Sequence, residues 1–275
     1  MGGEPLLNIS LLPACLRCLD SIDPVRGKVC SICGDRVLSS YAQRDADGHR
    51  RCPASRRIKR RLGRAGAYGS YDGGLRELIR LLKYNGVRPA AKLLGRMLAE
   101  ALTALEPGFE RLALEQASIL VVPVPLYKAK RRQRRFNQAE LIARAPKVPF
   151  ASERLQLAPD ILLRSRDTAS RIGLSSHQRR STLRGAFAVQ RAADVTGREV
   201  ILVDDVYTTG GTAAECAQVL RRARASKVWV ATTVARTLNL ASNHAEFRRG
   251  MDIDEDAAAA VVEERHDLLA KAAGR

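Results

Sequence analysis

Apolar residues recur along the middle of the chain in two patterns, which predict alternating strands and helices. Residues 75–84 and 89–105 carry apolar side chains at the i, i+3, i+4 spacing of amphipathic helices. Short apolar runs at residues 118–124, 199–203 and 228–234 predict strands. Further strands are expected at residues 67–71, 161–163 and 185–189, and further helices at residues 137–145 and 212–224. This alternation predicts an α/β fold, in which a parallel sheet is flanked by helices on both faces.

The same patterns divide the chain into three parts. Residues 1–62 are rich in cysteine and end in an arginine-rich stretch, which we interpret as a solvated linker or a patch that faces nucleic acid. Residues 63–237 carry the α/β pattern. Residues 238–275 have no strand signal, and we expect a helix or an acidic disordered tail without assigned chemistry.

The chain is strongly basic, because 47 Lys and Arg residues outnumber 29 Asp and Glu residues and give a net charge of +18. This charge favours polyanionic partners, whether nucleic acid, anionic lipid or phosphorylated small molecules. Aromatic residues make up only 4% of the chain, which leaves little surface for base stacking. A basic surface without a partner is the alternative. No apolar run reaches about 18–20 residues, the length of a membrane span, and the N-terminus lacks the features of a secretory signal. We therefore expect a cytoplasmic protein.

Two C-x-x-C pairs lie close together near the N-terminus. Four thiolates at such spacing suit a tetrahedral zinc ion, so the pairs predict a small structural zinc ribbon. The predicted ligands are Cys15, Cys18, Cys30 and Cys33. Cys52 is left as a fifth thiol near the metal, a remnant of a second knuckle or a buried residue. Cys216 lies on a predicted helix, where a small core residue is favoured over a nucleophile.

Residues 200–212 carry the strongest functional pattern of the chain. An apolar strand ends in Asp204 and Asp205, and a turn of threonine and glycine leads into a helix. Glycines before a helix expose backbone N–H groups at the positive end of the helix dipole, which favours phosphate. Nearby carboxylates suit sugar hydroxyls or a magnesium ion. The segment therefore predicts a sugar-phosphate site, and a solvated strand–helix turn is the alternative. The predicted phosphate binders are Thr208, Thr209, Gly210, Gly211 and Thr212.

A second basic cluster lies between the predicted strand at residues 118–124 and the following helix. Ligands of parallel sheets bind beyond the carboxyl ends of the strands, so this cluster is expected to face the acid pair. We interpret it as a site for pyrophosphate, and a solvated charge run is the alternative. Its predicted binders are Lys128, Lys130, Arg132 and Arg134.

The segment from Asp204 to Thr212 resembles the 5-phosphoribosyl 1-pyrophosphate (PRPP) signature of type I phosphoribosyltransferases. The resemblance implies that Asp204 and Asp205 hold the ribose 2′- and 3′-hydroxyls, while the following loop wraps the 5′-phosphate. Hypoxanthine-type members carry a carboxylate where this chain has Thr208. Its absence weakens any claim of purine salvage, although adenine- and orotate-type members also manage without it.

The order of motifs is similar to that of the ComF family, phosphoribosyltransferase-like proteins linked to competence and DNA uptake in bacteria. Members carry an N-terminal cysteine zinc module, a segment like Tyr71 to Lys83, a V-P-V-P-L strand end and an R-x-R-G-F-N-Q segment. Three positions depart from the pattern. Arg135 replaces a glycine, Arg171 stands where a mobile loop has Gln, and Thr182 stands where Asn is usual.

The resulting hypothesis is a type I phosphoribosyltransferase fold behind a zinc ribbon, which binds PRPP or a related ribose phosphate with magnesium. If the protein is an enzyme, Asp204 and Asp205 stabilise the ribose and metal at an oxocarbenium-like state, and the basic cluster accepts pyrophosphate charge. The acceptor and a general base cannot be named. The alternatives are a non-enzymatic accessory of DNA uptake that engages single-stranded DNA or a competence helicase, and a PRPP-sensing regulator.

Overall fold

The computed structural model describes residues 15–22, 24, 29–30, 43–44, 50–51, 65–71, 73–103, 105, 118–145, 155–168, 182–207 and 210–235. Several predictions fall outside these residues: those on the arginine-rich stretch and the C-terminal tail, and those on Cys33, Cys52, Arg171, Thr208 and Thr209.

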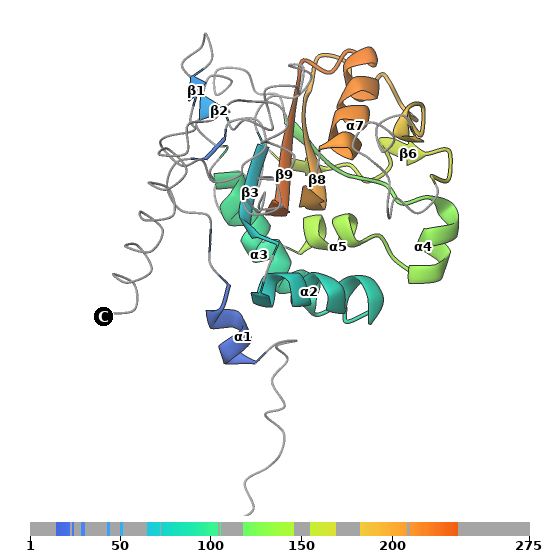
Figure 1. Ribbon diagram of the computed structural model, residues 1–275. Helices are drawn as coiled ribbons and strands as arrows, with labels where there is room; N and C mark the ends of the chain where they lie inside the picture. The colour runs from blue at the N-terminus through green and yellow to red at the C-terminus, as the bar shows by residue number, and fades with distance from the viewer. Residues whose placement is uncertain are drawn as a thin grey trace, which may run out of the picture. The chain divides into compact units, whose positions relative to one another are not determined.

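A parallel sheet of five strands forms the centre of the described part of the chain (Figure 1). Its order is β3 (Ala65–Ser70), β9 (Lys227–Ala235), β8 (Glu199–Tyr207), β4 (Ile119–Pro123) and β5 (Leu155–Leu157). The central strands are in register through Val121, Ile201 and Trp229. These strands are apolar on both faces because helices cover both faces. The predicted α/β fold with a parallel sheet is therefore confirmed.

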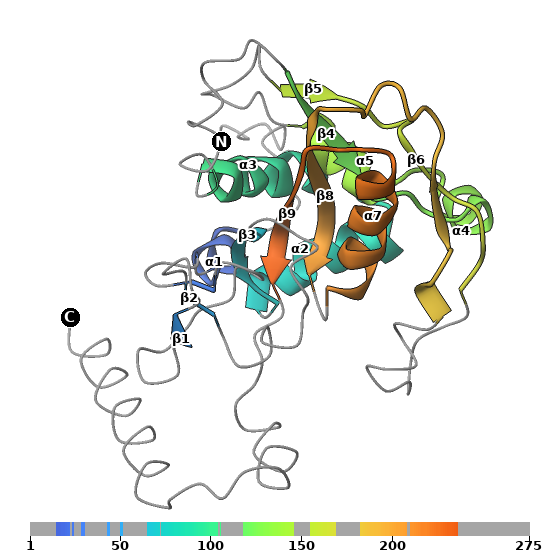
Figure 2. The same cartoon turned by 90° about the horizontal axis from the view of Figure 1, so that it is seen from above.

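Helices cover the two faces of the sheet from different parts of the chain (Figures 1 and 2). On one side lie α2 (Gly73–Tyr84), α3 (Ala90–Thr103) and α5 (Gln138–Arg144), and on the other lies α7 (Gly211–Arg222). Ile201 and Val203 of β8 belong to the core shared with α2 and α3, whereas Val200 and Leu202 pack with α7. The alternation of side chains along β8 thus builds two cores, one on each face.

The helix α2 follows β3 but does not simply run back along the sheet. It lies across the carboxyl ends of the strands, so its last turn reaches the edge where β8 ends (Figure 1). Its buried face holds Leu75, Leu78, Ile79 and Leu82, as the sequence predicts.

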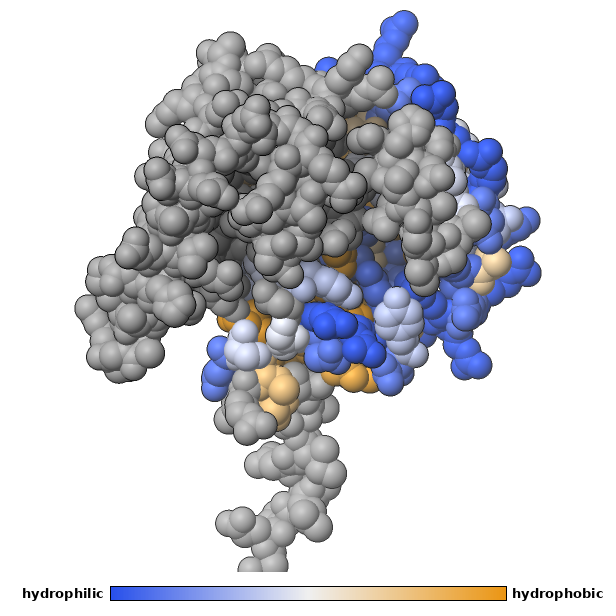
Figure 3. Space-filling model, viewed as in Figure 1, coloured by the Kyte–Doolittle hydropathy of each residue, from blue (hydrophilic) through white to orange (hydrophobic). Residues whose placement is uncertain are grey.

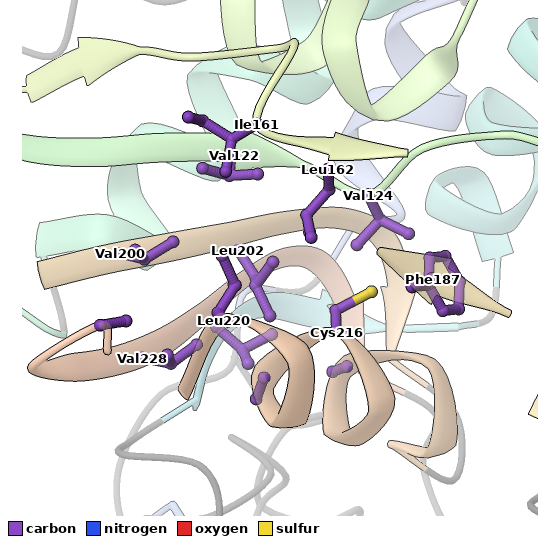
Figure 4. Packing of buried hydrophobic residues seen from close by; sticks show 14 of the residues in the cluster. Val122, Val124, Ile161, Leu162, Phe187, Val200, Leu202, Cys216, Leu220 and Val228 are labelled. Atoms are coloured by element: carbon purple, nitrogen blue, oxygen red, sulfur yellow. The ribbon is translucent and has the colours of Figure 1, made fainter. Parts of the chain in front are cut away.

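A two-stranded antiparallel sheet, β6 (Leu162–Arg164) and β7 (Phe187–Val189), packs on the α7 side. Cys216 of α7 is fully buried, and its sulfur points towards Val124, Leu162 and Phe187 (Figure 4). Burial raises the pKa of the Cys216 thiol well above its ordinary value, and the charge of Asp204 adds to this effect. The prediction that Cys216 is a core residue is confirmed.

The N-terminal cysteine segment packs against the first turn of α2. It contains α1 (Leu16–Asp20) and is followed along the chain by two short paired strands, β1 (Gln43–Arg44) and β2 (Arg50–Arg51). The hydroxyl of Ser21 accepts a hydrogen bond from the amide of Gly74 at 3.2 Å and donates one to the carbonyl of Cys18 at 2.8 Å. A β-carbon on Gly74 would overlap that carbonyl, so only glycine permits this close approach.

The structure differs from the predicted elements in two places near the proposed site. The basic cluster forms a helix, α4 (Lys128–Arg134), where the sequence pattern predicts none. The strand β8 does not end at Val203, because its pairing with β9 continues through Asp204 and Val206. The hydroxyl of Thr233 also donates a hydrogen bond to the carbonyl of Asp205 at 2.7 Å. Within the described residues, no helix combines the length and apolar character that crossing a membrane requires.

Candidate functional site

The two adjacent carboxylates lie near the carboxyl end of β8, the strand between β4 and β9. Successive strand residues point to opposite faces, so Asp204 faces the α7 side and Asp205 the α2 side. Asp205 is buried and Asp204 is half-buried. The amide of Asp205 donates a hydrogen bond to a carboxylate oxygen of Asp204 at 2.9 Å, which holds that side chain against the strand.

Lys83, at the end of α2, forms an ion pair with Asp205. Its Nζ atom lies 2.8 Å from Oδ2 of Asp205, and the two side chains are only 18% and 11% exposed. Burial alone would lower the pKa of Lys83, but the charge of Asp205 and the hydrogen bond to it outweigh burial. The charges of Asp204 and Tyr71 add to this, so the pKa of Lys83 is raised and its ammonium group stays charged. In the hypothesis drawn from the sequence, Lys83 is only the end of a family motif and has no role. The residues around Lys83 in the sequence do not indicate that Asp205 is its partner.

Gly210 and Gly211 place the N-terminus of α7 directly beyond the tip of β8. Gly210 is the N-cap residue and has a left-handed backbone with φ of 68°. A β-carbon there would also overlap the hydroxyl of Tyr207 and lie 2.7 Å from its Cζ atom. The first turn of α7 contains no acidic residue, so no carboxylate of that turn opposes the attraction of the helix N-terminus for anions. Thr212 is half-buried in this turn.

The basic helix α4 begins just after β4, beside the end of β8. The amide of Val124 donates to the carbonyl of Val203 at 2.8 Å, which fixes the chain at this point. Lys128, Lys130 and Arg132 are exposed on α4. Hydrophilic residues dominate the side of the molecule that carries α4 (Figure 3). Pyrophosphate binding by these residues stays a prediction.

Arg134, in the last turn of α4, is half-buried and makes two side-chain interactions. Its guanidinium lies 5.6 Å from the centre of the Tyr84 ring and donates to the side-chain oxygen of Gln138 at 3.0 Å. The side chain of Asn137 donates to the carbonyl of Val124 at 3.0 Å. The Asn and Gln of the F-N-Q segment therefore fix the path of the chain around α4. Arg135, which links Arg134 to the F-N-Q segment, has a left-handed backbone with φ of 63°. The family pattern has glycine at this position.

The described residues include three of the four predicted zinc ligands. Cys15 and Cys18 are exposed, and their sulfur atoms lie 3.3 Å apart, whereas Cys30 is buried. Among the residues that the structure describes, no three Cys, His, Asp or Glu side chains gather in a way that could hold a metal. Because Cys33 lies outside those residues, the four-cysteine site stays a prediction.

The sequence of the chain is similar to a known protein family and to several known proteins. Residues 148–267, which include β8 and α7, match the family model described as phosphoribosyl transferase domain. The DNA utilization protein YhgH of Escherichia coli K12 is 32% identical over 212 residues, which cover 73% of this chain and 88% of that protein. Competence protein F of Haemophilus influenzae is 26% identical over 229 residues, 78% of this chain and 94% of that protein. Competence protein ComFC of Bacillus subtilis is 23% identical over 220 residues, 78% of this chain and 80% of that protein.

Proposed function

The chain belongs to the ComF family of phosphoribosyltransferase-like proteins, and from that premise we propose that it binds PRPP or a related ribose phosphate with magnesium and acts in DNA uptake or utilisation. One observation carries the ligand proposal. Two carboxylates near the end of a buried strand and the glycine-capped N-terminus of α7 lie at the same edge of the sheet. A ribose phosphate needs both groups, since hydroxyls or a metal require oxygen acceptors and a phosphate requires N–H donors.

Each subsite has a distinct task in this proposal. Asp204 and Asp205 bind the ribose hydroxyls, directly or through the metal. The turn from Thr208 to Thr212 binds the 5′-phosphate. Four cations of α4 bind the pyrophosphate: Lys128, Lys130, Arg132 and Arg134. The carboxylate oxygens are hard ligands that suit magnesium, which typically keeps waters and phosphate oxygens as its other ligands. When bound, magnesium neutralises phosphate charge.

Calorimetry with PRPP and magnesium tests the ligand proposal. Wild-type protein is expected to bind, and Asp204→Asn and Asp205→Asn are each expected to weaken binding by about tenfold or more, because each removes a charged hydrogen-bond acceptor. Asp194→Asn is the matched control, since Asp194 is exposed in the turn before β8, at the opposite end of that strand. Folded wild-type protein that binds no PRPP would refute the proposal.

Turnover separates an enzyme from a regulator. Release of pyrophosphate in the presence of nucleobases or other nucleophiles identifies a transferase, whereas binding without release identifies a PRPP-sensing protein. The described residues suggest no general base for an acceptor, so the acceptor is best sought by screening.

Direct contact with DNA is the second proposed activity, and the net charge of +18 and the names of the relatives support it. Binding to single-stranded DNA through phosphates would fall steeply with salt, and Asp204→Asn would not abolish it. A competence helicase is the proposed protein partner. DNA binding that is absent at low salt would contradict a direct role.

A further inference from the structure

The ion pair between Lys83 and Asp205 has no role in ligand binding as proposed above. It joins the last turn of α2 to the acid pair, and both side chains are largely buried. The ammonium group is also influenced by the charge of Asp204. Lys83 therefore places a permanent positive charge beside Asp204 and Asp205, the two carboxylates that would hold the ribose and the metal.

A purely mechanical role is a weak explanation for this pair. The helix α2 is already anchored by Leu75, Leu78, Ile79 and Leu82, which are at most 2% exposed. Replacing a buried ion pair by apolar residues of similar size often leaves stability unchanged or raises it, so anchoring the helix does not require these charges. The charge itself therefore needs an explanation.

The charge changes what the acid pair attracts. Two carboxylates alone carry a formal charge of −2 and would attract a free divalent cation, but with Lys83 the group carries −1. A free cation is repelled by the ammonium group at short range. A metal that arrives with a polyphosphate meets no such penalty, because the ammonium group attracts the phosphate charge.

We propose that Lys83 makes metal binding at this site depend on the phosphorylated ligand. It keeps free divalent cations away from Asp204 and Asp205, so that metal enters together with a phosphorylated ribose. This inference rests on the proposed function for its second half. Its first half, the exclusion of free metal, concerns the acid pair alone.

Mn²⁺ is the probe, because its free concentration can be read by electron paramagnetic resonance without any turnover. Lys83→Gln removes the charge and keeps a hydrogen-bond donor for Asp205. It is expected to bind free Mn²⁺ about tenfold more tightly than wild type and to bind PRPP with magnesium more weakly. Lys83→Arg keeps the charge and is expected to retain the wild-type preference. Lys92→Gln, which changes an exposed lysine of α3, is the matched control and is expected to behave as wild type.

Unchanged Mn²⁺ affinity in folded Lys83→Gln protein would overturn the inference. If that variant does not fold, wild-type protein decides: Mn²⁺ must bind at least about tenfold more weakly without PRPP than with it, and equal affinities would overturn the inference. If wild type binds no PRPP, the proposed function fails separately. Tighter Mn²⁺ binding by Lys83→Gln would then still support the exclusion of free metal.

Discussion

Gly210 is expected to be among the positions of the described chain least tolerant of a single added methyl group. The substitution Gly210→Ala meets two separate obstacles. The first is the left-handed backbone at φ of 68°, which costs a residue with a β-carbon about 1–2 kcal/mol. The second is the side chain of Tyr207, whose hydroxyl and ring occupy the space that the methyl group needs.

Tyr207 cannot easily move away to relieve the overlap with the added methyl group. Tyr207 is 4% exposed and belongs to the core that packs against α7, so its ring has little room to shift. Overpacking of a core costs about 1–3 kcal/mol. Together the two parts predict a loss of about 2–5 kcal/mol in the free energy of unfolding.

The assay is urea denaturation followed by circular dichroism, with Gly197→Ala as the matched control. Gly197 has a similar backbone, with φ of 74°, but a β-carbon at that position would have no atom within 4 Å. The control is therefore expected to lose only the backbone part, about 1–2 kcal/mol. Equal losses at the two glycines would refute the claim that Tyr207 restricts Gly210.

Two further predictions concern the turn after α4 and the cysteines. Arg135→Gly is expected to raise the free energy of unfolding by about 0.5–1 kcal/mol, because relief of the left-handed backbone exceeds the added entropy of the unfolded chain; a lower stability in urea would contradict this. Elemental analysis is expected to find zinc in the purified protein, and Cys15→Ser to lower its content while Cys216→Ala, in the core, does not; wild-type protein without zinc would contradict the ribbon.

The fold could be predicted because the sheet and its helices have strong local signals. The apolar runs of β8 and β9 and the leucines of α2 identify these elements without knowledge of their partners. The helix α4 could not be predicted in this way. None of its residues is buried, so it has no apolar face and its sequence carries no helical period.

The candidate site could be predicted only where its residues are neighbours in the sequence. Asp204, Asp205 and the glycines before α7 form one continuous segment. Lys83 is far from that segment in the chain, and its contact with Asp205 depends on α2 crossing the carboxyl ends of the strands. Such a crossing is a tertiary property, and no local pattern contains it.

The helix α2 contacts a different part of the molecule at each end. Gly74 in its first turn is hydrogen-bonded to Ser21 beside the cysteine pair, and Lys83 in its last turn is bonded to Asp205. A helix of 12 residues is about 18 Å long, so α2 connects the two regions directly across that distance. Coupling between binding sites is reciprocal. If a metal on the cysteine pair changes the affinity of the acid pair for its ligand by some factor, the effect also runs in the other direction. The ligand of the acid pair then changes the affinity of the cysteine pair for the metal by the same factor.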